Sequence, residues 1–524
     1  MPDPALFDDG PPPTCPARFN MAAYVLEAGR ARPDHPALLT LAGPGQVALS
    51  LSHGALRRAV LETAAGLQAA GLARGDRIVL RLGNVPAFPI LFYASLALGA
   101  VPVPLSAQLT ASELAPMLDL IAPAMIAHGG DLPLPDHKAL RVDADRLDHL
   151  RTCGTLAGFA DTGADDPAYI LFTSGTGGRP RAVLHAHRAA FARRMMWHDW
   201  YGLTPRDRML HAGAFNWSYT LGTGLTDPWA AGATALIYTG PPDRAVWAAL
   251  AAEHGATIFA AVPGVYRQLL KSGADCRAGF SALRHGLSAG EAMSPDLHRA
   301  WQDATGCRVH EALGMTEIST YVSGAPHRPA PTGTSGYPQA GRRIAILPET
   351  DADTASGARP APVPRGTPGL LAVSTRDPGL MLGYLDEAGA PPRPADGDWF
   401  LTGDRAVMAE DGAITHLGRA DDVLNVQGYR VSAREVELAL AAHPQVEEVA
   451  VAALRRRADL DVMAAFIVPV AGSHPAPETL SDFLNDRLAR YKQPREFILL
   501  DALPRSANGK ILKRVLTDAH GWKG

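Results

Sequence analysis

Short apolar runs of strand length alternate along this chain with longer stretches that have helical periodicity. The strand-like runs cover residues 78–81, 168–172, 233–238, 257–261 and 286–288. The helix-like stretches among them cover residues 55–70, 245–254 and 294–304. A strand, a helix and a second strand in succession form a parallel pair whose sheet faces are covered by helices. The alternation therefore predicts a layered α/β architecture with a largely parallel sheet.

Roughly the last hundred residues follow a different pattern. Helices are expected at 433–442 and 478–489, and strands at 446–453, 462–468 and 497–500. This order predicts a small α+β domain that follows the large α/β domain. The pattern alone places the boundary between about residues 400 and 445.

The composition excludes several classes of protein. The chain has 524 residues, of which 47% are apolar and 19% charged, so it is long enough and apolar enough for a large globular core. Its formal charge of −4 gives no electrostatic reason to expect nucleic acid as a partner. The four cysteines, Cys15, Cys153, Cys276 and Cys307, form no CxxC pair. We expect them to be reduced thiols of a cytoplasmic protein.

Neither a targeting signal nor a membrane span is predicted. The N-terminus is Pro-rich and lacks a basic region followed by an apolar stretch, so we expect no secretory signal. Residues 88–105 are uncharged and long enough to be considered as a span, but Pro89, Pro102, Pro104 and Gly99 interrupt them. We expect a buried helix followed by a core strand there.

A loop rich in glycine and hydroxyl side chains follows the strand-like run 168–172. Residues 172–183 read Phe-Thr-Ser-Gly-Thr-Gly-Gly-Arg-Pro-Arg-Ala-Val. Glycines allow the backbone N–H groups to turn toward one ligand, the hydroxyls add donors, and arginine adds charge. The spacing differs from that of a Walker loop. The loop predicts a polyphosphate site formed by the following residues: Thr173, Ser174, Gly175, Thr176, Gly177, Gly178 and Arg181.

Four further segments, at 288–291, 313–317, 399–430 and 503–511, complete a family pattern. They contain Ser-Ala-Gly-Glu, Leu-Gly-Met-Thr-Glu, Trp-Phe-Leu-Thr-Gly-Asp with Gly-Arg-Ala-Asp-Asp, and Leu-Pro-Arg-Ser-Ala-Asn-Gly-Lys-Ile. With the Gly-rich loop, in this order, they resemble the adenylate-forming enzymes: acyl-CoA synthetases, peptide-synthetase adenylation domains and luciferases. The resemblance runs from about residue 20 to the end of the chain. It implies an AMP-binding domain at 1–420 and a mobile lid domain at 421–524, with the hinge at Asp421.

The resemblance also implies a reaction and residues that carry it out. ATP and a carboxylate would give an acyl-adenylate and pyrophosphate, with Mg²⁺ on Glu317, Thr316 on the α-phosphate and Lys510 between the two anions. Asp404 would bind the ribose hydroxyls and Arg419 the ribose or a phosphate. The remaining residues implied in nucleotide binding are Gly290, Glu291, Ala292, Ala312, Leu313, Gly314 and Met315.

The second half-reaction would transfer the acyl group to the thiol of CoA. By the same resemblance the lid domain rotates, which removes Lys510 and brings Gly428 to the pantetheine channel. Tyr429 and Arg430 follow in the same loop, and Arg430 could meet a CoA phosphate. The run 455–457 of three arginines is better interpreted as a solvated charge run.

The acyl pocket is expected to be short and aromatic. Its candidate residues are Phe215, Trp217, Tyr219, Val265, Ala289 and Ile318. The segments around Tyr219 and Ala289 are most similar to those of benzoate-type ligases, and the bulk of Trp217 argues against a long acyl tunnel. The alternative is that these aromatic residues are ordinary core.

The chain departs from the family pattern in the phosphate loop and in the adenine site. Arg181 stands where the family usually has lysine, and arginine keeps the charge and adds a fork that fits phosphate. Leu313 replaces an aromatic residue. His185 and His187 follow the loop on a stretch that we expect to be helical, as polar groups rather than catalysts.

Three function classes remain open. The leading hypothesis is an AMP-forming carboxylate–CoA ligase that acts on a compact, benzoate-like acid. Within the same class, the alternative substrate is a short- or medium-chain aliphatic acid. The second class is an adenylating enzyme that loads a carrier-protein thiol, and the third is a nucleotide-binding protein without turnover. The expected partners are the acid, ATP and CoA. A homodimer is one option for the assembly.

Overall fold

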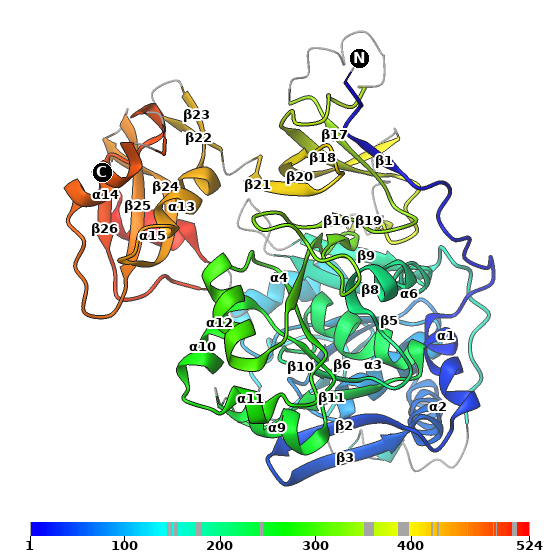
Figure 1. Cartoon of the computed structure of the whole chain (residues 1–524). Coiled ribbons are helices and arrows are strands. Elements are labelled where there is room, and N and C mark those ends of the chain that lie inside the picture. Colours follow the sequence, from blue (N-terminus) through cyan, green and yellow to red (C-terminus); the bar gives the residue numbers. More distant parts are fainter. Residues whose placement is uncertain are drawn as a thin grey trace. The chain divides into compact units, whose positions relative to one another are not determined.

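The computed structural model describes residues 2–130, 132–143, 146, 149–150, 156–173, 181–241, 243, 245–349, 361–385, 398–420, 423–426, 429–457, 460–485, 487–488, 490–505 and 511–522. The chain divides into two compact units (Figure 1). The N-terminal unit comprises residues 7–343 and 374–400, and the C-terminal unit comprises residues 1–6, 344–373 and 401–524. The predicted domain boundary at Asp421 lies outside the described residues and stays a prediction.

A nine-stranded sheet forms the centre of the N-terminal unit. Its order is β16-β15-β14-β13-β12-β10-β11-β2-β3. The strands are β2 (Pro36–Gly43), β3 (Gln46–Ser52), β10 (Arg208–His211), β11 (Thr234–Tyr238), β12 (Ile258–Ala260), β13 (His285–Ala289), β14 (Val309–Met315), β15 (Ser319–Ser323) and β16 (Tyr337–Pro338). The strands from β2 to β14 pair in parallel, and antiparallel pairs close both edges. The predicted parallel α/β sheet is confirmed, and its strands β10, β12, β13 and β14 end at one edge.

Two smaller sheets complete the β-structure of this unit. One is a parallel sheet in the order β5-β4-β6-β7, built from β4 (Arg77–Arg81), β5 (Val101–Pro104), β6 (Met125–His128) and β7 (Leu140–Val142). The other is antiparallel in the order β19-β9-β8, built from β8 (Pro167–Thr173), β9 (Arg181–Ala186) and β19 (Gly383–Leu385).

The helical expectation for His185 and His187 is wrong. His185 lies on β9, and His187 follows directly after that strand. Strand β9 pairs on one side with β8 and on the other with β19, which is about two hundred residues away in the sequence. A stretch with antiparallel partners on both sides has its backbone N–H and C=O groups satisfied as a strand.

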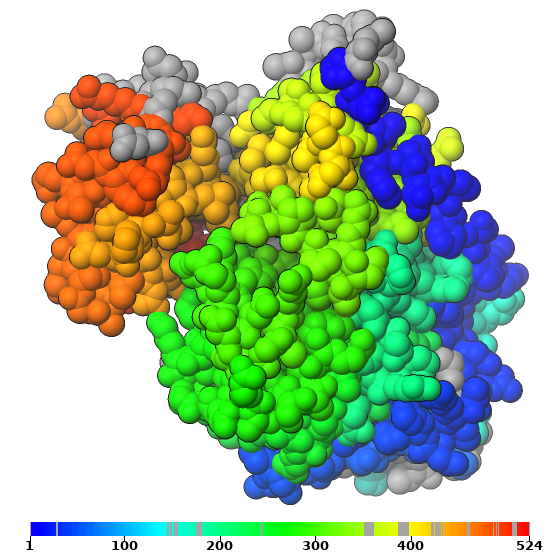
Figure 2. All heavy atoms as spheres, in the orientation of Figure 1, coloured from blue at the N-terminus to red at the C-terminus, as the bar shows by residue number. Residues whose placement is uncertain are grey.

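Helices pack on both sides of these sheets. They are α1 (Met21–Glu27), α2 (His53–Ala69), α3 (Ala87–Ala97), α4 (Ala111–Ile121), α6 (Ala189–Ala192), α7 (Arg194–Met196), α8 (Asp227–Ala231), α9 (Val246–His254), α10 (Pro263–Lys271), α11 (Cys276–Gly279) and α12 (Pro295–Thr305), with a 3₁₀ turn η1 (Ala28–Ala31). In Figure 2 the green segment that carries α9 to α12 forms one continuous part of the surface of this unit. The predicted helices 55–70, 245–254 and 294–304 are confirmed as α2, α9 and α12.

Local chemistry explains where these helices begin and end. The Ser294 hydroxyl accepts a hydrogen bond from the Leu297 N–H at 3.3 Å, Pro295 is compatible with the first turn of α12, and Gly306 ends the helix at φ 82°. Thr110 and Glu113 form a complete capping box at the start of α4. Helix α3 is buried along almost its whole length, as predicted for 88–105. Within the described part of the chain no helix has the length and apolarity needed to cross a membrane.

The C-terminal unit holds three sets of strands. A five-stranded sheet in the order β1-β17-β18-β20-β21 consists of β1 (Leu6–Asp8), β17 (Arg343–Leu347), β18 (Gly369–Ser374), β20 (Trp399–Met408) and β21 (Ile414–Arg419). The hairpin strands are β22 (Val423–Val426) and β23 (Tyr429–Ser432), and the third sheet contains β24 (Val446–Arg457), β25 (Leu460–Pro469) and β26 (Glu496–Leu499).

The α+β pattern predicted for the end of the chain is confirmed. Helices α13 (Ala433–Ala441), α14 (Pro477–Asn485) and α15 (Lys513–His520) accompany the β24-β25-β26 sheet, with a 3₁₀ turn η6 (Arg490–Lys492). Val436, Leu440, Leu480 and Leu484 pack against buried residues of β24 and β25. In the predicted charge run, Arg456 binds Glu496 and the carbonyl oxygen of His520 rather than standing free in solvent.

Candidate active site

The carboxyl ends of four adjacent strands bring candidate residues together. His211, Ala260, Ala289 and Met315 are the last residues of β10, β12, β13 and β14. Ala289 and Ala312 are direct register partners, so a predicted acyl-pocket residue and a predicted nucleotide residue lie on neighbouring strands. Ligands of open parallel sheets bind at this edge, where the loops that follow the strands meet.

Thr316 and Glu317 lie in a tight turn between β14 and β15. Met315 pairs with Ser319, so Thr316, Glu317 and Ile318 are the residues of the turn. The space around Gly314 is closed, because a Cβ there would meet the Ser319 carbonyl oxygen at 2.5 Å. Ser319 itself has φ 80°, which is uncommon for a residue with a side chain. The backbone that presents Thr316 and Glu317 is therefore tightly constrained.

A side chain from β9 and the main chain just before β19 hold this turn. The His185 Nε2–H donates to the Thr316 carbonyl oxygen at 2.9 Å, and the Met381 N–H donates to the Glu317 carbonyl oxygen at 2.8 Å. Burial lowers the pKa of His185 to about 4, so the ring is neutral at physiological pH and carries its proton on Nε2. The ring also stacks on Tyr169, with the centroids 4.7 Å apart.

The buried Glu317 carboxylate is linked to the phosphate loop through Tyr384. The Tyr384 hydroxyl donates to Glu317 Oε1 at 2.7 Å. The Arg181 guanidinium lies 3.3 Å from the centroid of the Tyr384 ring, which is a cation–π contact. Arg181 also pairs in register with Thr173, so the two residues on either side of the segment 174–180 lie opposite each other.

A buried ion pair lies next to the same turn. The Arg193 guanidinium donates to Asp227 at 2.6 and 3.0 Å and to the Ser319 hydroxyl at 2.6 Å. Tyr201 and Trp197 also donate to the Asp227 carboxylate, at 2.9 and 3.3 Å. Burial opposes the charge on Arg193, but the Asp227 carboxylate outweighs it and holds the pKa of the guanidinium above its ordinary value.

Two π-helical turns surround this ion pair. They are η3 (Trp197–Tyr201) and η4 (Thr220–Thr226), and η4 leads directly into Asp227. The backbone of η4 passes very close to the arginine, since a Cβ on Gly222 would meet the Arg193 guanidinium at 2.1 Å. Turns of the π type are rare and occur often at functional sites.

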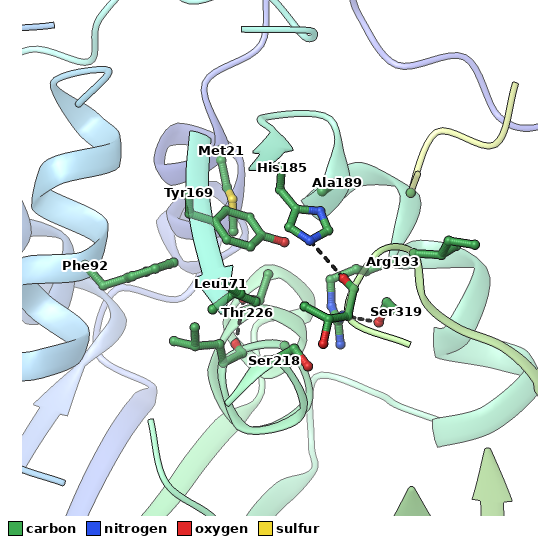
Figure 3. Close-up of a pocket in the computed structure, with 15 residues that line it drawn as sticks. Met21, Phe92, Tyr169, Leu171, His185, Ala189, Arg193, Ser218, Thr226 and Ser319 are labelled. Atoms are coloured by element: carbon green, nitrogen blue, oxygen red, sulfur yellow. Dashed lines mark hydrogen bonds between the residues drawn. The ribbon is translucent and has the colours of Figure 1, made fainter. Parts of the chain in front are cut away.

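A cavity of about 30 Å³ lies between these groups. In Figure 3, Tyr169 and His185 lie above the cavity, Thr226 and Ser218 lie below it, and Arg193 lies next to Ser319. Thr316 and Ile318 also line it. A space of this size has room for about one or two water molecules and not for an acyl group.

The predicted acyl-pocket residues fall into different environments. Tyr219 and Ala289 belong to one buried cluster, which also includes Ala312, Trp200 and Leu287. Tyr219 donates from its hydroxyl to the Leu287 carbonyl oxygen at 3.1 Å, and the half-buried Trp217 packs edge-on against it at 6.5 Å.

The other three lie apart from that cluster. Phe215 is fully buried and stacks on Phe88 at 5.1 Å, in the core that contains α3. Val265 packs against the core around α9 to α12, and Ile318 lines the small cavity. The structure thus brings together Tyr219 and Ala289, with Trp217 against Tyr219, and assigns Phe215 and Val265 to other hydrophobic clusters.

His211 is a buried group at this edge that the sequence analysis did not select. It is 1% exposed, and its ring packs edge-on against Tyr219 at 4.5 Å. Neither of its ring nitrogens has a hydrogen-bond partner within the part of the chain that the structure describes. Burial lowers the pKa of His211 to about 3. A buried imidazole without partners is costly, which marks the position as a candidate ligand contact.

Family models match both parts of the chain. The AMP-binding enzyme family matches residues 25–385, and the AMP-binding enzyme C-terminal domain matches residues 435–510. The chain belongs to the AMP-binding enzymes. The predicted family resemblance is confirmed.

Relatives and solved structures agree with this assignment. This AMP-binding enzyme is 30% identical over 473 residues to 3-hydroxybenzoate–CoA/4-hydroxybenzoate–CoA ligase of Thauera aromatica, which covers 86% of this chain and 88% of the relative. It is 31% identical over 542 residues to acyl-coenzyme A synthetase ACSM5 of Mus musculus. This match covers 96% of this chain and 90% of the relative. A benzoate CoA ligase from Burkholderia xenovorans superposes with a TM-score of 0.83 at 27% identity, over 95% of this chain and all of that one. The predicted fold class and enzyme class, an AMP-forming acid–CoA ligase, are confirmed.

The C-terminal unit of this AMP-binding enzyme contains two predicted nucleotide residues. Asp404 and Arg419 are register partners on β20 and β21, and their side chains lie 3.5 Å apart. Asp404 is buried and lies 3.2 Å from His416 Nε2, while Arg419 donates to the Thr402 carbonyl oxygen at 2.8 Å. Gly403 has φ 77°, and a Cβ there would meet the Arg419 guanidinium at 2.6 Å. Glycine is therefore needed between Thr402 and Asp404.

Other predicted nucleotide residues lie on or after two strands of the large sheet. Directly after β13 come Gly290, Glu291 and Ala292, and β14 carries Leu313, Gly314 and Met315. Gly290 has φ 96°, which explains the glycine at that position. Several predicted residues lie outside the described part of the chain: Ser174, Gly175, Thr176, Gly177, Gly178, Asp421, Gly428 and Lys510. The same holds for the side chains of Tyr429 and Arg430 on β23.

Sequence reasoning missed Arg193, Asp227, His211 and Tyr384. Asp227 and Arg193 are charged residues within apolar surroundings in the sequence, and such residues are buried only when they are paired. This signal marks Arg193 and Asp227 as unusual, but it does not show that the two residues pair with each other. Tyr384 has no local signal, because its contacts with Arg181 and Glu317 depend on the pairing of β19 with β9.

Proposed function

We propose that this AMP-binding enzyme activates a compact aromatic carboxylic acid with ATP and transfers the acyl group to CoA. In the first half-reaction a carboxylate oxygen attacks the α-phosphorus of ATP, giving the acyl-adenylate and pyrophosphate. In the second half-reaction the CoA thiol attacks the acyl carbon, and AMP leaves. The observation that carries the proposal is the register pairing of Ala289 with Ala312, which puts the acyl and nucleotide candidates side by side near the Thr316–Glu317 turn.

In the proposed first half-reaction, Thr316 and Glu317 act on the phosphates of ATP. The constrained backbone of their turn holds both side chains in place before ATP binds, so that little ordering entropy is lost in the reaction. The Thr316 hydroxyl donates to an α-phosphate oxygen. Arg181, with the hydroxyls and glycines of the 173–178 loop, binds the β- and γ-phosphates.

The chemistry of Glu317 fits a divalent cation. Its carboxylate is an oxygen ligand of the type that Mg²⁺ prefers, and the Tyr384 hydroxyl fixes its orientation through Oε1. When bound there, Mg²⁺ neutralises charge on the phosphate oxygens. The role of Tyr384 is to orient the carboxylate, and Arg181, besides binding phosphate, also holds the Tyr384 ring in place.

Residues of the C-terminal unit complete the proposal. Asp404 accepts hydrogen bonds from the ribose hydroxyls, and Arg419 contacts the ribose or a phosphate. Lys510 neutralises the carboxylate and the α-phosphate in the first half-reaction. Gly428, Tyr429 and Arg430 serve the CoA in the second half-reaction. These roles rest on the family pattern and are tested below through Lys510 and Gly428.

The acid is proposed to be a benzoate that carries a polar ring substituent. Tyr219 and Trp217 offer aromatic surface to a flat ring, and Ala289, in the same cluster as Tyr219, has a small side chain. His211 packs against Tyr219 and offers a ring nitrogen to a hydroxyl group on the substrate. The Thauera aromatica relative is named for hydroxybenzoates, which supports this choice.

The proposal also includes the setting of the reaction. We propose a cytoplasmic enzyme that uses Mg²⁺, and a homodimer as its assembly.

The test is ATP-dependent release of pyrophosphate over a panel of carboxylic acids, with and without CoA. The panel contains acetate, octanoate, palmitate, cyclohexanecarboxylate, benzoate and the hydroxybenzoates. The proposal predicts that turnover needs CoA and is fastest with a hydroxybenzoate. Fastest turnover with octanoate or acetate would refute the proposed aromatic pocket. Turnover with a carrier protein but not with CoA would refute CoA as the acyl acceptor.

A further inference from the structure

Three side chains of the types that bind metal ions lie close together in the N-terminal unit, and none of them is assigned to ATP or to the acid. His198 and Asp199 lie on η3, and His327 lies in the loop after β15. One potential ligand atom from each of the three lies within 4.8 Å of the other two. The His198 Nδ1 is 2.7 Å from Asp199 Oδ1, and the His327 Nε2 is 3.6 Å from the same oxygen.

The backbone under each ligand is fixed. Ala325 and Arg328 exchange two backbone hydrogen bonds, of 3.0 and 3.1 Å, which close a tight turn around Pro326 and His327. Pro326 packs against the end of η3, since a Cβ on Gly202 would meet its ring at 3.1 Å. The turn that carries His327 is therefore seated directly on the element that carries the other two ligands.

The Asp199 carboxylate is also held in place. The Ala340 N–H donates to Oδ2 at 2.6 Å, which leaves Oδ1 directed at the two histidines. The Ser323 hydroxyl donates to the Asp199 carbonyl oxygen at 2.7 Å and so fixes the main chain. A carboxylate that is positioned by backbone and hydroxyl donors loses little freedom when it binds a cation.

Two of the separations in this cluster lie on either side of the spacing expected around a tetrahedral ion. Ligands that are about 2.0–2.2 Å from a zinc ion are about 3.3 Å from one another. The two observed separations from Asp199 Oδ1 lie on either side of this value. The rings of His198 and His327 have centroids 4.1 Å apart, and both side chains are well exposed, with 79% and 44% of their surfaces accessible. Because both imidazoles are exposed, rotation of their rings can bring a nitrogen of each toward one ion.

We propose that His198, Asp199 and His327 form a binding site for a divalent transition-metal ion, with Zn²⁺ as its ligand. Two imidazoles and one carboxylate select such an ion over Mg²⁺, which prefers oxygen ligands alone. Water fills the fourth position. The ion connects η3 to the 325–328 turn. Because η3 also carries Tyr201, which binds Asp227, the ion stabilises the part of the unit that holds the buried ion pair.

The experiment titrates Zn²⁺ alone, without ATP, into the full-length chain after EDTA treatment and desalting. Binding is followed by competition with a chromophoric chelator, and stability by thermal unfolding. We compare wild type with His327→Asn and Asp199→Asn. The matched controls are His474→Asn, at an exposed histidine of the other unit, and Glu317→Gln, which removes the carboxylate proposed to bind Mg²⁺.

The proposal predicts one Zn²⁺ site in wild type and in both controls. In His327→Asn and Asp199→Asn the affinity falls by about tenfold or more. Saturating Zn²⁺ raises the unfolding midpoint of wild type by about 2–4 °C and leaves that of His327→Asn unchanged. Equal stoichiometry and affinity in wild type, His327→Asn and Asp199→Asn would overturn the proposal. A loss of the site in Glu317→Gln alone would assign the bound ion to the proposed active site instead.

Discussion

The Arg193 guanidinium donates to the Ser319 hydroxyl at 2.6 Å, and Ser319 has φ 80°. Ser319 is the second residue after Glu317, at the base of the turn that carries the proposed Thr316 and Glu317 contacts. A residue with a side chain keeps such a conformation only where its surroundings compensate for the strain. Here the compensation comes from an arginine that is itself held by Asp227, Tyr201 and the close backbone of η4.

Removal of Arg193 should destabilise the N-terminal unit strongly. Arg193→Ala leaves the Asp227 carboxylate, of which 1% is exposed, without its cation. We expect a loss of about 3–5 kcal/mol in the free energy of unfolding. The double variant Arg193→Met/Asp227→Leu should recover a large part of this loss, because neither charge is then buried alone. Urea denaturation measures both the loss of stability in the single variant and its recovery in the double variant.

An exposed ion pair provides the control. Arg30 and Glu27 are 3.2 Å apart with more than half of each side chain exposed, so Arg30→Ala should cost less than about 1 kcal/mol. Equal losses in Arg30→Ala and Arg193→Ala would show that the buried pair does not support the fold as described.

Gly314→Ala should impair adenylation without unfolding the protein. The new Cβ would meet the Ser319 carbonyl oxygen at 2.5 Å, so the backbone of the Thr316–Glu317 turn must shift. A misplacement of this kind costs about a hundredfold in rate. The measurement is single-turnover formation of the acyl-adenylate. Gly158→Ala is the matched control, because its Cβ would meet nothing within 4 Å. Full activity of Gly314→Ala would contradict the tight turn.

Stability should fall in mild acid because of five buried histidines. Burial lowers the pKa of His185, His187 and His285 to about 4, and that of His211 and His310 to about 3. Their pKa in the unfolded chain is about 6.5. Between about pH 6.5 and pH 4 the unfolded chain binds more protons than the folded one at these positions, so stability rises with pH there. The stability that depends on these neutral rings is fully present above about pH 6.5, and it is lost as the pH falls.

Each of these histidines contributes up to about 1.4 kcal/mol per pH unit to the slope of the free energy of unfolding against pH. His211→Leu removes one of them, so the fall in stability between pH 6.5 and pH 5 should be less steep in this variant than in wild type. Urea midpoints measured at a series of pH values report the difference. A stability that stays constant from pH 7 to pH 5 would refute the assignment of these rings as buried and neutral.

Arg181→Ala should raise the KM for ATP. The variant loses a charged donor at the end of the phosphate loop and the contact with the Tyr384 ring. The expected rise is about tenfold or more, and Arg181→Lys, which keeps the charge, should show a smaller effect. Arg299→Ala, in an exposed pair with Asp296, serves as the control. An unchanged KM in Arg181→Ala would remove Arg181 from the phosphate site.

Apolar periodicity in the sequence predicted most of the architecture. The strands 78–81, 168–172, 233–238 and 286–288 and the helix within 88–105 are present, because each of them buries a local pattern that can be recognised in the sequence itself. Strand β9 was mistaken for a helix, since its partner β19 follows about two hundred residues later. The π-turns η3 and η4 have no sequence signal of their own, and they depend on packing around Arg193 and Asp227.

The candidate site was predictable as a set of motifs and not as an arrangement. Thr316 and Glu317 were selected from a motif, and their roles stay predictions. The contacts of their turn with His185 and Arg193 come from residues more than a hundred positions away. The expectation for Phe215 rests on its sequence position alone. Its sequence position favours a pocket wall, and the structure stacks it on Phe88 within the core, so its role in the pocket stays a prediction.

The most direct test of the two-step account separates the half-reactions. Wild type, Lys510→Ala and Gly428→Leu are each given 3-hydroxybenzoate, ATP and Mg²⁺, and in a second series the supplied acyl-adenylate and CoA, with the products identified by mass spectrometry. The account predicts that Lys510→Ala forms no adenylate yet converts supplied adenylate to the thioester, and that Gly428→Leu does the reverse. Equal loss of both half-reactions in both variants, or no adenylate from any aromatic acid in wild type, would contradict it.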